Sequence, residues 1–219
     1  MAGVSVAVLQ TLPIFASLPP ARMEALGRLA SLRHVARGGV VLREGENTNA
    51  IYFILNGALK VLVSDADGRE VILTILGRGE LFGEMGAIDD NPRSATVVAT
   101  QSSDLVVINK SDFQQILSDH FEVALAIMRG LANRLRVADR NIESLALLDV
   151  YGRVARLLLD QSEVVDGRRV INRPMTKQDI AKMIGASREM VSRVMKDLQL
   201  QGLIEESDDC IVLHDKLDT

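Results

Sequence analysis

The spacing of hydrophobic residues changes near residue 108, and this change constrains the fold more than any other feature. Before it, short runs of aliphatic and β-branched residues recur at intervals of about 8–12 residues, as antiparallel strands do. After it, apolar residues recur every three or four positions, which is the period of a helix. The 219 residues therefore predict an α+β chain in which a β-module precedes helices.

The predicted β-module is also the glycine-rich part of the chain. Nine of the 16 glycines lie between Gly38 and Gly86, and Asp67-Gly68 is a typical hairpin turn. Short strands joined by such turns predict an antiparallel barrel or sandwich. The runs expected to form strands are 40–42, 51–55, 59–63, 71–76, 95–99 and 105–108.

A long helix is predicted after the β-module. Ser111 and Gln114 have the spacing of a capping box, which predicts a helix start at Ser111. Farther on, apolar residues alternate at spacings of four and three, and Arg129, Arg134, Arg136 and Arg140 flank them. This heptad favours a dimerisation helix in a coiled coil; the alternative is an amphipathic helix that lies on its own domain. The heptad residues are Ala124, Met128, Leu131, Leu135, Ala138, Ile142 and Leu145.

The last part of the chain is predicted to be a compact winged module. Asp149 is a suitable N-cap for a helix over 150–161, and Asp166-Gly167 is expected to form a turn. A further helical pattern covers 176–200. Two short apolar runs on either side of Ser207, Asp208 and Asp209 predict a terminal hairpin over 203–213.

Residues 177–196 have the spacing of a helix-turn-helix. Ala181 is a small residue where the two helices approach, and Gly185 tolerates the positive φ that the turn requires. Thr176, with Asp179, and Ser187 are the expected N-caps of the two helices. The apolar side chains expected to hold the helices together are Ile180, Ile184, Val191, Val194 and Leu198.

The second of these helices carries polar residues at spacings that place them on one face. Arginine matches the O6 and N7 atoms of guanine, and glutamate accepts a hydrogen bond from N4 of cytosine. The face therefore favours base reading, whereas the alternative is a solvated helix surface with i,i+4 pairs. The face consists of Arg188, Glu189, Ser192, Arg193 and Lys196, and the residues expected to contact DNA also include Thr176, Lys177, Gln178 and Ser187 at the starts of the two helices.

The formal net charge of −4 is unusual for a DNA-binding protein. Local charge differs from this total, because residues 168–196 carry a formal charge of +6. This basic segment favours DNA as a partner, and the rest of the chain is acidic. Its basic residues are Arg168, Arg169, Arg173, Lys177, Lys182, Arg188, Arg193 and Lys196.

The segment from Gly79 to Ala95 has the composition of an anion site. A tight glycine-containing turn offers backbone N–H groups, and Arg93 would add a charge-assisted contact. Glu84 is placed to accept from a sugar hydroxyl. Such turns are common between strands, so these residues alone give a weak signal for phosphate.

Taken together, these motifs resemble the cyclic AMP receptor protein/fumarate-nitrate reduction regulator (CRP/FNR) family over nearly the whole chain. The matching segments are 83–85 with 93–95, 145–150 and 185–193. The resemblance implies a β-roll cyclic-nucleotide domain at 1–120, a dimerisation helix and hinge at 121–148, and a winged helix-turn-helix at 149–219. It also implies a homodimer that reads a palindrome of TGTGA-like half-sites about 34 Å apart and works with RNA polymerase.

The resemblance also implies a set of ligand-binding residues. Glu84 would meet the ribose, Arg93 and Ser94 the cyclic phosphate, and the base would lie against β-module and long-helix residues. Where cyclic-AMP-responsive members have a Thr-Ser pair, this chain has Ala138 and Asp139. Cyclic AMP is favoured, and cyclic di-GMP, another effector or none are the alternatives. The ligand-binding set is Leu73, Thr74, Leu76, Gly83, Glu84, Met85, Arg93, Ser94, Arg134, Ala138 and Asp139.

Several other classes are not indicated by the sequence. Cys210 is the single cysteine, and His34, His120 and His214 are scattered, so no iron–sulfur cluster, haem or metal is expected. Met85 is expected in the core rather than as a haem ligand. No nucleophile–base spacing, metal cluster or Walker loop suggests an enzyme. No apolar run approaches the ~20 residues of a membrane span, and no signal peptide is recognised, which predicts a cytoplasmic protein.

Overall fold

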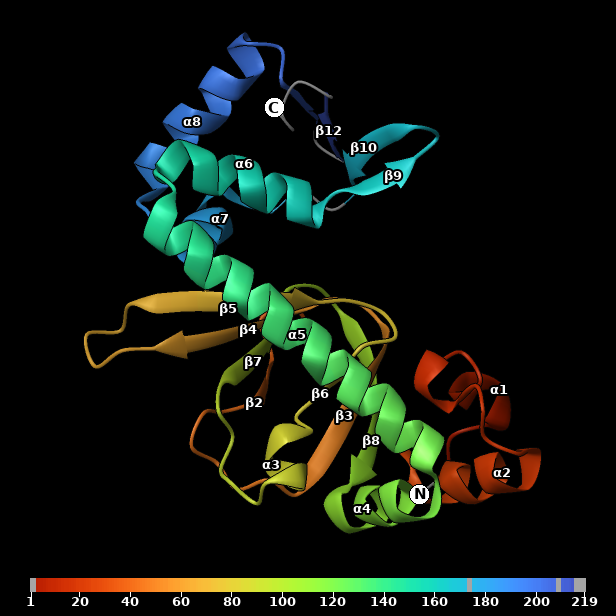
Figure 1. Cartoon of the computed structure of the whole chain (residues 1–219). Coiled ribbons are helices and arrows are strands. Elements are labelled where there is room, and N and C mark those ends of the chain that lie inside the picture. The colour runs from red at the N-terminus through yellow and green to blue at the C-terminus, as the bar shows by residue number, and fades with distance from the viewer. Residues whose placement is uncertain (1–2, 173–174, 208–209, 215–219) are drawn as a thin grey trace. The chain divides into compact units, whose positions relative to one another are not determined.

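The computed structural model describes residues 3–172, 175–207 and 210–214. The chain divides into two compact units, Met1–Asn133 and Arg134–Thr219, most of whose elements are labelled in Figure 1. The division falls inside the long helix α5 (Phe121–Leu147), so each unit contains part of that helix. Among the described residues, no helix is both long and apolar enough to cross a membrane.

The first unit is built on eight antiparallel strands in two sheets. The sheet orders are β1-β8-β3-β6 and β2-β7-β4-β5. All six predicted strand segments are confirmed, whereas β1 and β6 were not predicted. The strands are β1 (Ser31–Val35), β2 (Val40–Leu42), β3 (Ala50–Asn56), β4 (Leu59–Ser64), β5 (Glu70–Leu76), β6 (Leu81–Phe82), β7 (Thr96–Ala99) and β8 (Ser103–Asn109).

Strand β3 is buried on both of its faces. Tyr52 and Ile54 belong to the core between the two sheets. Ile51 and Phe53 belong to a second core on the other side of the first sheet, where the ring centroids of Phe53 and Phe15 are 4.9 Å apart. Burial on both faces explains the continuous apolar run in this part of the sequence.

Helices cover the outer face of the first sheet. Buried residues from the N-terminal helices and from α4 and α5, including Leu9, Phe113 and Val123, join the second core. The N-terminal helices were not predicted from the sequence. The helical elements of this unit are α1 (Val6–Leu9), a 3-10 turn (Pro13–Phe15), α2 (Pro20–Leu29), α3 (Met85–Ile88), α4 (Lys110–Asp119) and the start of α5.

The capping box predicted at Ser111 is wrong. Helix α4 begins at Lys110 after Asn109, and Asn109 makes no side-chain cap. Ser111 therefore lies inside the first turn. The Gln114 amide donates instead to the carbonyl oxygen of Ala87 at 2.8 Å. This side chain therefore links α4 to α3 and does not form the cap that the local pattern predicted.

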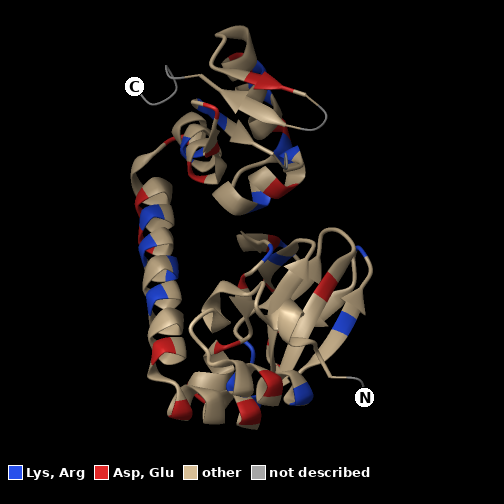
Figure 2. Ribbon diagram, turned by 90° about the vertical axis from the view of Figure 1, so that its right-hand side faces the viewer, with Lys and Arg blue, Asp and Glu red and all other residues tan. Residues whose placement is uncertain are grey.

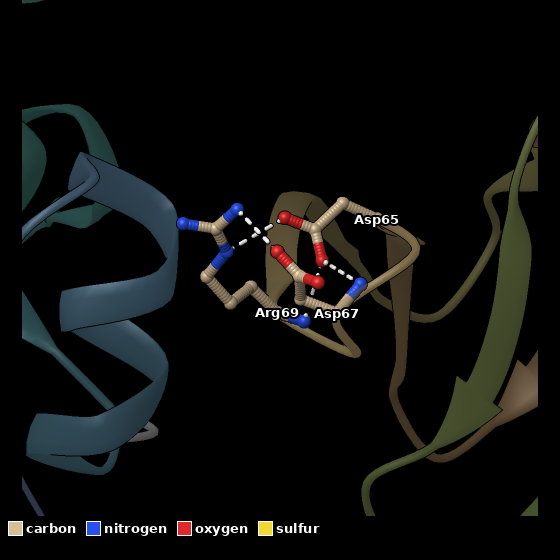
Figure 3. A network of polar contacts seen from close by, with 3 residues as sticks. All are labelled: Asp65, Asp67 and Arg69. Atoms are coloured by element: carbon tan, nitrogen blue, oxygen red, sulfur yellow. Dashed lines mark hydrogen bonds and ion pairs between the residues drawn. The ribbon is translucent and has the colours of Figure 1, made fainter.

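The β4–β5 hairpin has an ordered turn, as Asp67-Gly68 predicted. Gly68 has a φ of +78°. The Asp65 carboxylate accepts from the backbone N–H groups of Asp67 and Arg69 at 3.0 and 2.9 Å, and the Arg69 guanidinium contacts both aspartates (Figure 3). The backbone N–H of Arg69 is the largest cause that lowers the pKa of Asp65.

The predicted heptad lies on a single helix, α5. Val123 and Ile127, which are not heptad residues, are buried in the core of the first unit, and the heptad residue Leu131 packs partly buried against the same core. Four large heptad residues are 49–65% exposed, and both basic and acidic segments lie along the helix (Figure 2). The exposed heptad residues are Met128, Leu135, Ile142 and Leu145.

The second unit packs three helices against a four-stranded antiparallel sheet of order β11-β12-β10-β9. Asp149 is confirmed as the N-cap of the first helix, since it accepts from the backbone N–H of Gly152 at 2.8 Å. Asp208, Asp209 and Arg173 lie outside the described residues. The elements are α6 (Val150–Gln161), β9 (Glu163–Val165), β10 (Arg168–Ile171), α7 (Lys177–Ile184), α8 (Arg188–Leu200), β11 (Ile204–Glu206) and β12 (Ile211–Leu213).

The turn at Asp166-Gly167 joins β9 to β10, two strands that were not predicted. Both turn residues have positive φ, 49° and 78°, as the two central residues of a type I′ hairpin turn do. The exposed, three-residue β9 gives little periodic signal, which explains why only the turn was evident from the sequence.

Candidate functional site

Arg93 is held in the first unit by carbonyl oxygens. The residue is only 5% exposed, and its two terminal nitrogens donate to Gly83 and Ala50 at 2.6 Å each. The guanidinium carbon lies 6.0 Å from the centre of the Tyr52 ring. Since a guanidinium has five N–H donors, these two bonds fix its position and leave donors for an anion.

Charge around Arg93 is consistent with such a role. Burial is the largest cause that lowers the pKa of Arg93, and the charges of Tyr52, Glu46 and Glu84 oppose it. Glu84 is itself 2% exposed and precedes α3, where its carbonyl oxygen accepts from Ala87 and Ile88. A buried cation and a buried carboxylate therefore share this loop.

Gly83 allows the loop to approach Arg93. Its φ is +78°, and a Cβ at this position would lie 2.7 Å from Nη1 of Arg93. Any larger side chain would therefore push against the guanidinium and adopt an unfavourable backbone conformation. The glycine in the predicted motif is explained by this contact.

Three side chains outside the predicted set anchor the loop between Glu84 and Arg93. Thr48 donates to the carbonyl oxygen of Asn91 at 3.4 Å, Lys110 pairs with Asp90 at 2.5 Å, and Gln114 holds Ala87. These residues come from separate parts of the sequence. Nothing in their local pattern indicated that they support the site.

The remaining predicted ligand residues of the first unit lie at differing depths. Leu76 is 2% exposed and belongs to the core between the sheets, whereas Leu73 is 47% exposed at an irregularity in the β4–β5 pairing. Ser94 is exposed, and its hydroxyl lies 3.8 Å from the Met85 sulfur. Met85 is 50% exposed, so the prediction that it is a core residue is wrong.

Thr74 lies partly exposed on β5. The other predicted ligand residues, Arg134, Ala138 and Asp139, lie on α5 within the second unit. Their role toward a ligand stays a prediction.

The second unit contains the predicted helix-turn-helix. Gly185 ends α7 with a φ of +65°. Thr176 accepts from the backbone N–H of Asp179 at 3.1 Å, and Ser187 accepts from that of Met190 at 3.2 Å, so both predicted N-caps are confirmed. Ile180, Ala181, Ile184, Val191 and Leu198 are buried, Val194 packs at the edge of this core, and Met195 was missed.

The opposite face of α8 is exposed along its length. Among the residues that the structure describes, none forms a hydrogen bond or ion pair with the side chains of Arg188, Glu189, Arg193 or Lys196. Ser192 is exposed on the same face. At the start of α7, Gln178 is exposed, whereas Lys177 pairs with Glu206 at 3.6 Å. The α8 face therefore presents charges that are available to a partner.

A residue that the sequence did not single out supports the turn between α7 and α8. Arg153 on α6 donates from Nη1 to the carbonyl oxygen of Ile184 at 2.8 Å. Its Nε is buried without a hydrogen-bond partner among the described residues. The cation sits at the C-terminal end of α7, where a positive charge is favourable.

One nucleophile–base arrangement is present that the sequence did not indicate. The ring of His34 contacts Asp104 through Nδ1 at 2.7 Å and Ser102 through Nε2 at 3.2 Å. The histidine and aspartate side chains are 64% and 51% exposed. Ser102 is also exposed, so these side chains form an open surface cluster rather than a pocket.

Within the described ranges, no group of three or more His, Cys, Asp or Glu side chains is arranged to hold a metal ion. His214 contacts Glu205 at 3.2 Å. The Cys210 sulfur lies 3.3 Å from the Ser207 hydroxyl.

Comparison with known protein families assigns the Arg93 loop and the helix-turn-helix to two different domains. A cyclic nucleotide-binding domain model matches residues 32–120, and a Crp-like helix-turn-helix domain model matches residues 152–217. The first match contains the Arg93 loop, and the second contains α7 and α8.

Individual relatives match most of the chain. The chain is 35% identical over 182 residues to the cAMP-activated global transcriptional regulator Vfr of Pseudomonas aeruginosa, covering 78% of this chain and 83% of that one. It is 30% identical to a CRP-like cAMP-activated global transcriptional regulator of Mycobacterium tuberculosis, covering 92% of each. Among solved structures, the c-di-GMP responsive regulator CLP of Xanthomonas campestris matches with a TM-score of 0.74 and 28% identity, covering 90% of this chain and 99% of that one.

Proposed function

Because this chain belongs to the CRP/FNR family of transcription regulators, we propose that it is a dimeric, sequence-specific DNA-binding regulator controlled by a cyclic nucleotide. The observation that carries the proposal is the exposed face of α8, where Arg188, Glu189 and Arg193 have no partner among the described residues. Such groups suit base edges in the major groove. The regulator would act in the cytoplasm, together with RNA polymerase.

The nucleotide is proposed to bind at the loop from Gly83 to Ser94. Glu84 would accept from the ribose hydroxyl, and Arg93 would donate its remaining N–H groups to the cyclic phosphate. Both side chains are buried, which supports this assignment because a hydrogen bond to a charged group is stronger in a buried site than in water. Ser94 would add a hydroxyl contact to the phosphate.

We favour cyclic AMP over cyclic di-GMP as the effector. Relatives that cover most of the chain are described as cAMP-activated, whereas one structural neighbour is described as c-di-GMP responsive. Ala138 and Asp139 depart from the residues that read adenine in cAMP-responsive members, so they are where the choice between nucleotides would be made.

Control by the nucleotide requires a difference in affinity between two states of the protein. We propose that binding at the first unit biases the packing of α5 near Asp149 and so places the two α8 faces in successive major grooves. Arg188, Glu189 and Arg193 would read a TGTGA-like half-site, and Thr176, Lys177, Gln178, Ser187, Ser192 and Lys196 would contact DNA around it.

Calorimetric titration with each nucleotide, followed by a mobility-shift assay on a TGTGA palindrome, tests the proposal. We expect heat with cyclic AMP and a tighter DNA complex in its presence. Binding heat with cyclic di-GMP but not with cyclic AMP would make cyclic di-GMP the favoured effector. No heat with either, together with an unchanged DNA complex, would contradict nucleotide control.

Arg188→Ala separates base reading from general DNA affinity. We expect a loss of about 1–3 kcal/mol and relaxed preference at one base pair. An equal loss on all sequences would show that Arg188 does not read a base. A module that regulates protein partners instead would bind DNA weakly and with little salt dependence, whereas phosphate contacts give a steep dependence.

A further inference from the structure

Three polar side chains at one edge of the first unit have the order of a nucleophile, a base and a carboxylate. His34 lies on β1, which is the edge strand of its sheet. In the antiparallel register, His34 lies directly opposite Asp104 of β8. Ser102 immediately precedes β8, two residues before Asp104, and residues two apart in an extended chain point to the same face. The sheet therefore brings all three side chains together.

The backbone that carries Ser102 is held by its buried neighbours. Ser103 is 0% exposed, and a Cβ on Gly57 would overlap the Ser103 side chain, so the two segments pack directly against each other. The backbone N–H and the hydroxyl of Thr100 both donate to the carbonyl oxygen of Ala58 at 2.9 Å. The Ser102 hydroxyl is thus exposed on a fixed segment, as a preorganised reactive group requires.

The contacts of the His34 ring determine where its proton lies. Nδ1 is 2.7 Å from the Asp104 carboxylate, and an ionised carboxylate can only accept a hydrogen bond. Nδ1 of the neutral ring therefore carries the proton, and Nε2 keeps its lone pair. The Ser102 hydroxyl lies 3.2 Å from Nε2, so it donates to this nitrogen. This direction of hydrogen bonding is the one in which a histidine can remove the proton of a serine nucleophile.

We propose that Ser102 is an acylation site that is activated by His34 and Asp104. In this step, Oγ of Ser102 attacks the carbonyl carbon of an acyl phosphate, and the hydroxyl proton moves to Nε2 of His34, which then passes it to solvent. The Oγ–C bond forms as the C–O bond to phosphate breaks, and the phosphate leaves with that electron pair. The Asp104 carboxylate holds the ring and stabilises the imidazolium that forms. The products are an ester on Ser102 and free phosphate.

The exposure of the cluster determines which donors can react. The His34 and Asp104 side chains are 64% and 51% exposed, so water surrounds the reacting atoms. An open site gives little of the stabilisation that an enclosed active site provides for charge on the attacked carbonyl oxygen. The donor therefore needs a good leaving group, such as phosphate or nitrophenolate. The site is one of modification, and it uses none of the residues assigned to the nucleotide or to DNA.

Acetylation of the full chain by p-nitrophenyl acetate tests the proposal. The probe transfers only an acetyl group, and peptide mass spectrometry locates that group. We expect acetylation of Ser102 ahead of every other serine, and Ser102→Ala should remove it. His34→Gln keeps a hydrogen-bonding side chain but removes the base, so it should slow acetylation of Ser102 at least about tenfold.

A second pair of variants distinguishes a catalytic unit from a structural contact. Asp104→Asn should slow acetylation of Ser102 by about threefold or more, because the ring loses its carboxylate. The double variant His34→Gln/Asp104→Asn should be no slower than His34→Gln alone, since Asp104 acts only through the ring. All three side chains lie at the surface, so we expect folding to be retained, and urea unfolding of each variant checks this.

His120→Gln is the matched control, because it removes an imidazole outside the cluster, at the end of α4. It should leave the acetylation rate of Ser102 within about twofold. Acetyl phosphate should acetylate the same serine, whereas a phosphoryl group found there would contradict the proposed step. If Ser102 is not acetylated preferentially, or if His34→Gln reacts as fast as the natural chain, the proposal is overturned. The cluster is then only a cross-strand contact that stabilises the sheet edge.

Discussion

Gly83 determines where the Arg93 guanidinium can lie. A Cβ at this position would overlap Nη1 of Arg93, so Gly83→Ala should displace the group that we assign to the nucleotide phosphate. We expect cyclic nucleotide binding to weaken tenfold or more by calorimetry. The free energy of unfolding should fall by about 1–3 kcal/mol, because the backbone is strained at the positive φ.

The control variant Gly68→Ala separates the effect of backbone strain from the effect of displacing the Arg93 guanidinium. Gly68 has the same φ of +78°, but a Cβ at this position would have no other atom within 4 Å. The variant should lose about 1 kcal/mol of unfolding free energy and retain nucleotide affinity. If both variants bind nucleotide equally well, Arg93 does not hold the phosphate in the way we propose.

Asp65 gives a pH-dependent test of the β4–β5 turn. Its pKa is lowered chiefly by the backbone N–H of Arg69. Since the folded-state pKa lies below that of the unfolded chain, ionised Asp65 stabilises the fold above the unfolded pKa. This contribution is lost as the pH falls through the folded-state pKa. We expect a carboxyl-carbon NMR titration to place the midpoint of Asp65 below the ordinary aspartate range.

The variant Arg69→Met separates two contributions to the lowered pKa of Asp65, that of the backbone N–H groups and that of the ion pair. The variant removes the guanidinium that contacts Asp65 and Asp67 but keeps the backbone N–H of residue 69. Most of the lowering of the Asp65 pKa should therefore remain. A midpoint that returns to the ordinary range would show that the side chain, rather than the turn backbone, controls this carboxylate.

At the scale of elements, the sequence predicted what local chemistry determines. The N-caps Asp149, Thr176 and Ser187 and the positive φ of Gly185 follow from single residues acting on their own backbone. The cap predicted at Ser111 failed, and the Gln114 side chain instead donates to Ala87 of helix α3. A contact between elements far apart in the sequence leaves no local pattern.

The same reason explains which parts of the candidate site were predicted. Gly83, Glu84 and Arg93 lie in one continuous segment with a recognisable motif, whereas Thr48 and Lys110 reach that segment from elsewhere. Strand β1 was missed because its middle residues are exposed and it has no apolar alternation. Prediction from sequence therefore identified the groups proposed to contact a ligand and missed those that hold them.

Helix α6 is expected to affect DNA binding through Arg153. This side chain caps the C-terminal end of α7 and so holds the turn that precedes α8. Arg153→Met removes the hydrogen bond and the charge, and we expect about 1–2 kcal/mol less unfolding free energy. DNA affinity, measured by fluorescence anisotropy, should fall roughly tenfold, and Arg153→Lys should restore part of it because it keeps a charged donor.

Arg156→Met is the matched control on the same helix. Arg156 makes an i,i+4 contact with Asp160 at 3.6 Å, with side chains 46% and 34% exposed. Such a pair contributes little, so the unfolding free energy should change by less than about 0.5 kcal/mol and DNA affinity should stay the same. Equal effects of the two substitutions would assign the loss to α6 in general rather than to the cap.

For the whole molecule, the formal net charge of −4 is a poor guide to DNA binding. Phosphate contacts release counterions from DNA, and that release depends on the charges at the interface rather than on the total. The basic residues of α8 are exposed and unpaired among the described residues. We therefore expect steep salt dependence from an acidic protein, with the acidity elsewhere limiting non-specific binding.

Two substitutions with the same change of charge decide between local and total charge. Lys196→Gln and Arg37→Gln each remove one positive charge, the first from α8 and the second from the turn between β1 and β2. On a palindrome bound by two subunits, Lys196→Gln should make the negative slope of log affinity against log salt shallower by about 2, because each subunit gives up one ion pair with a DNA phosphate. Arg37→Gln should leave the slope unchanged, because Arg37 is not part of the proposed interface. Equal changes in slope would mean that the total charge governs binding, and the assignment of the α8 face would then be wrong.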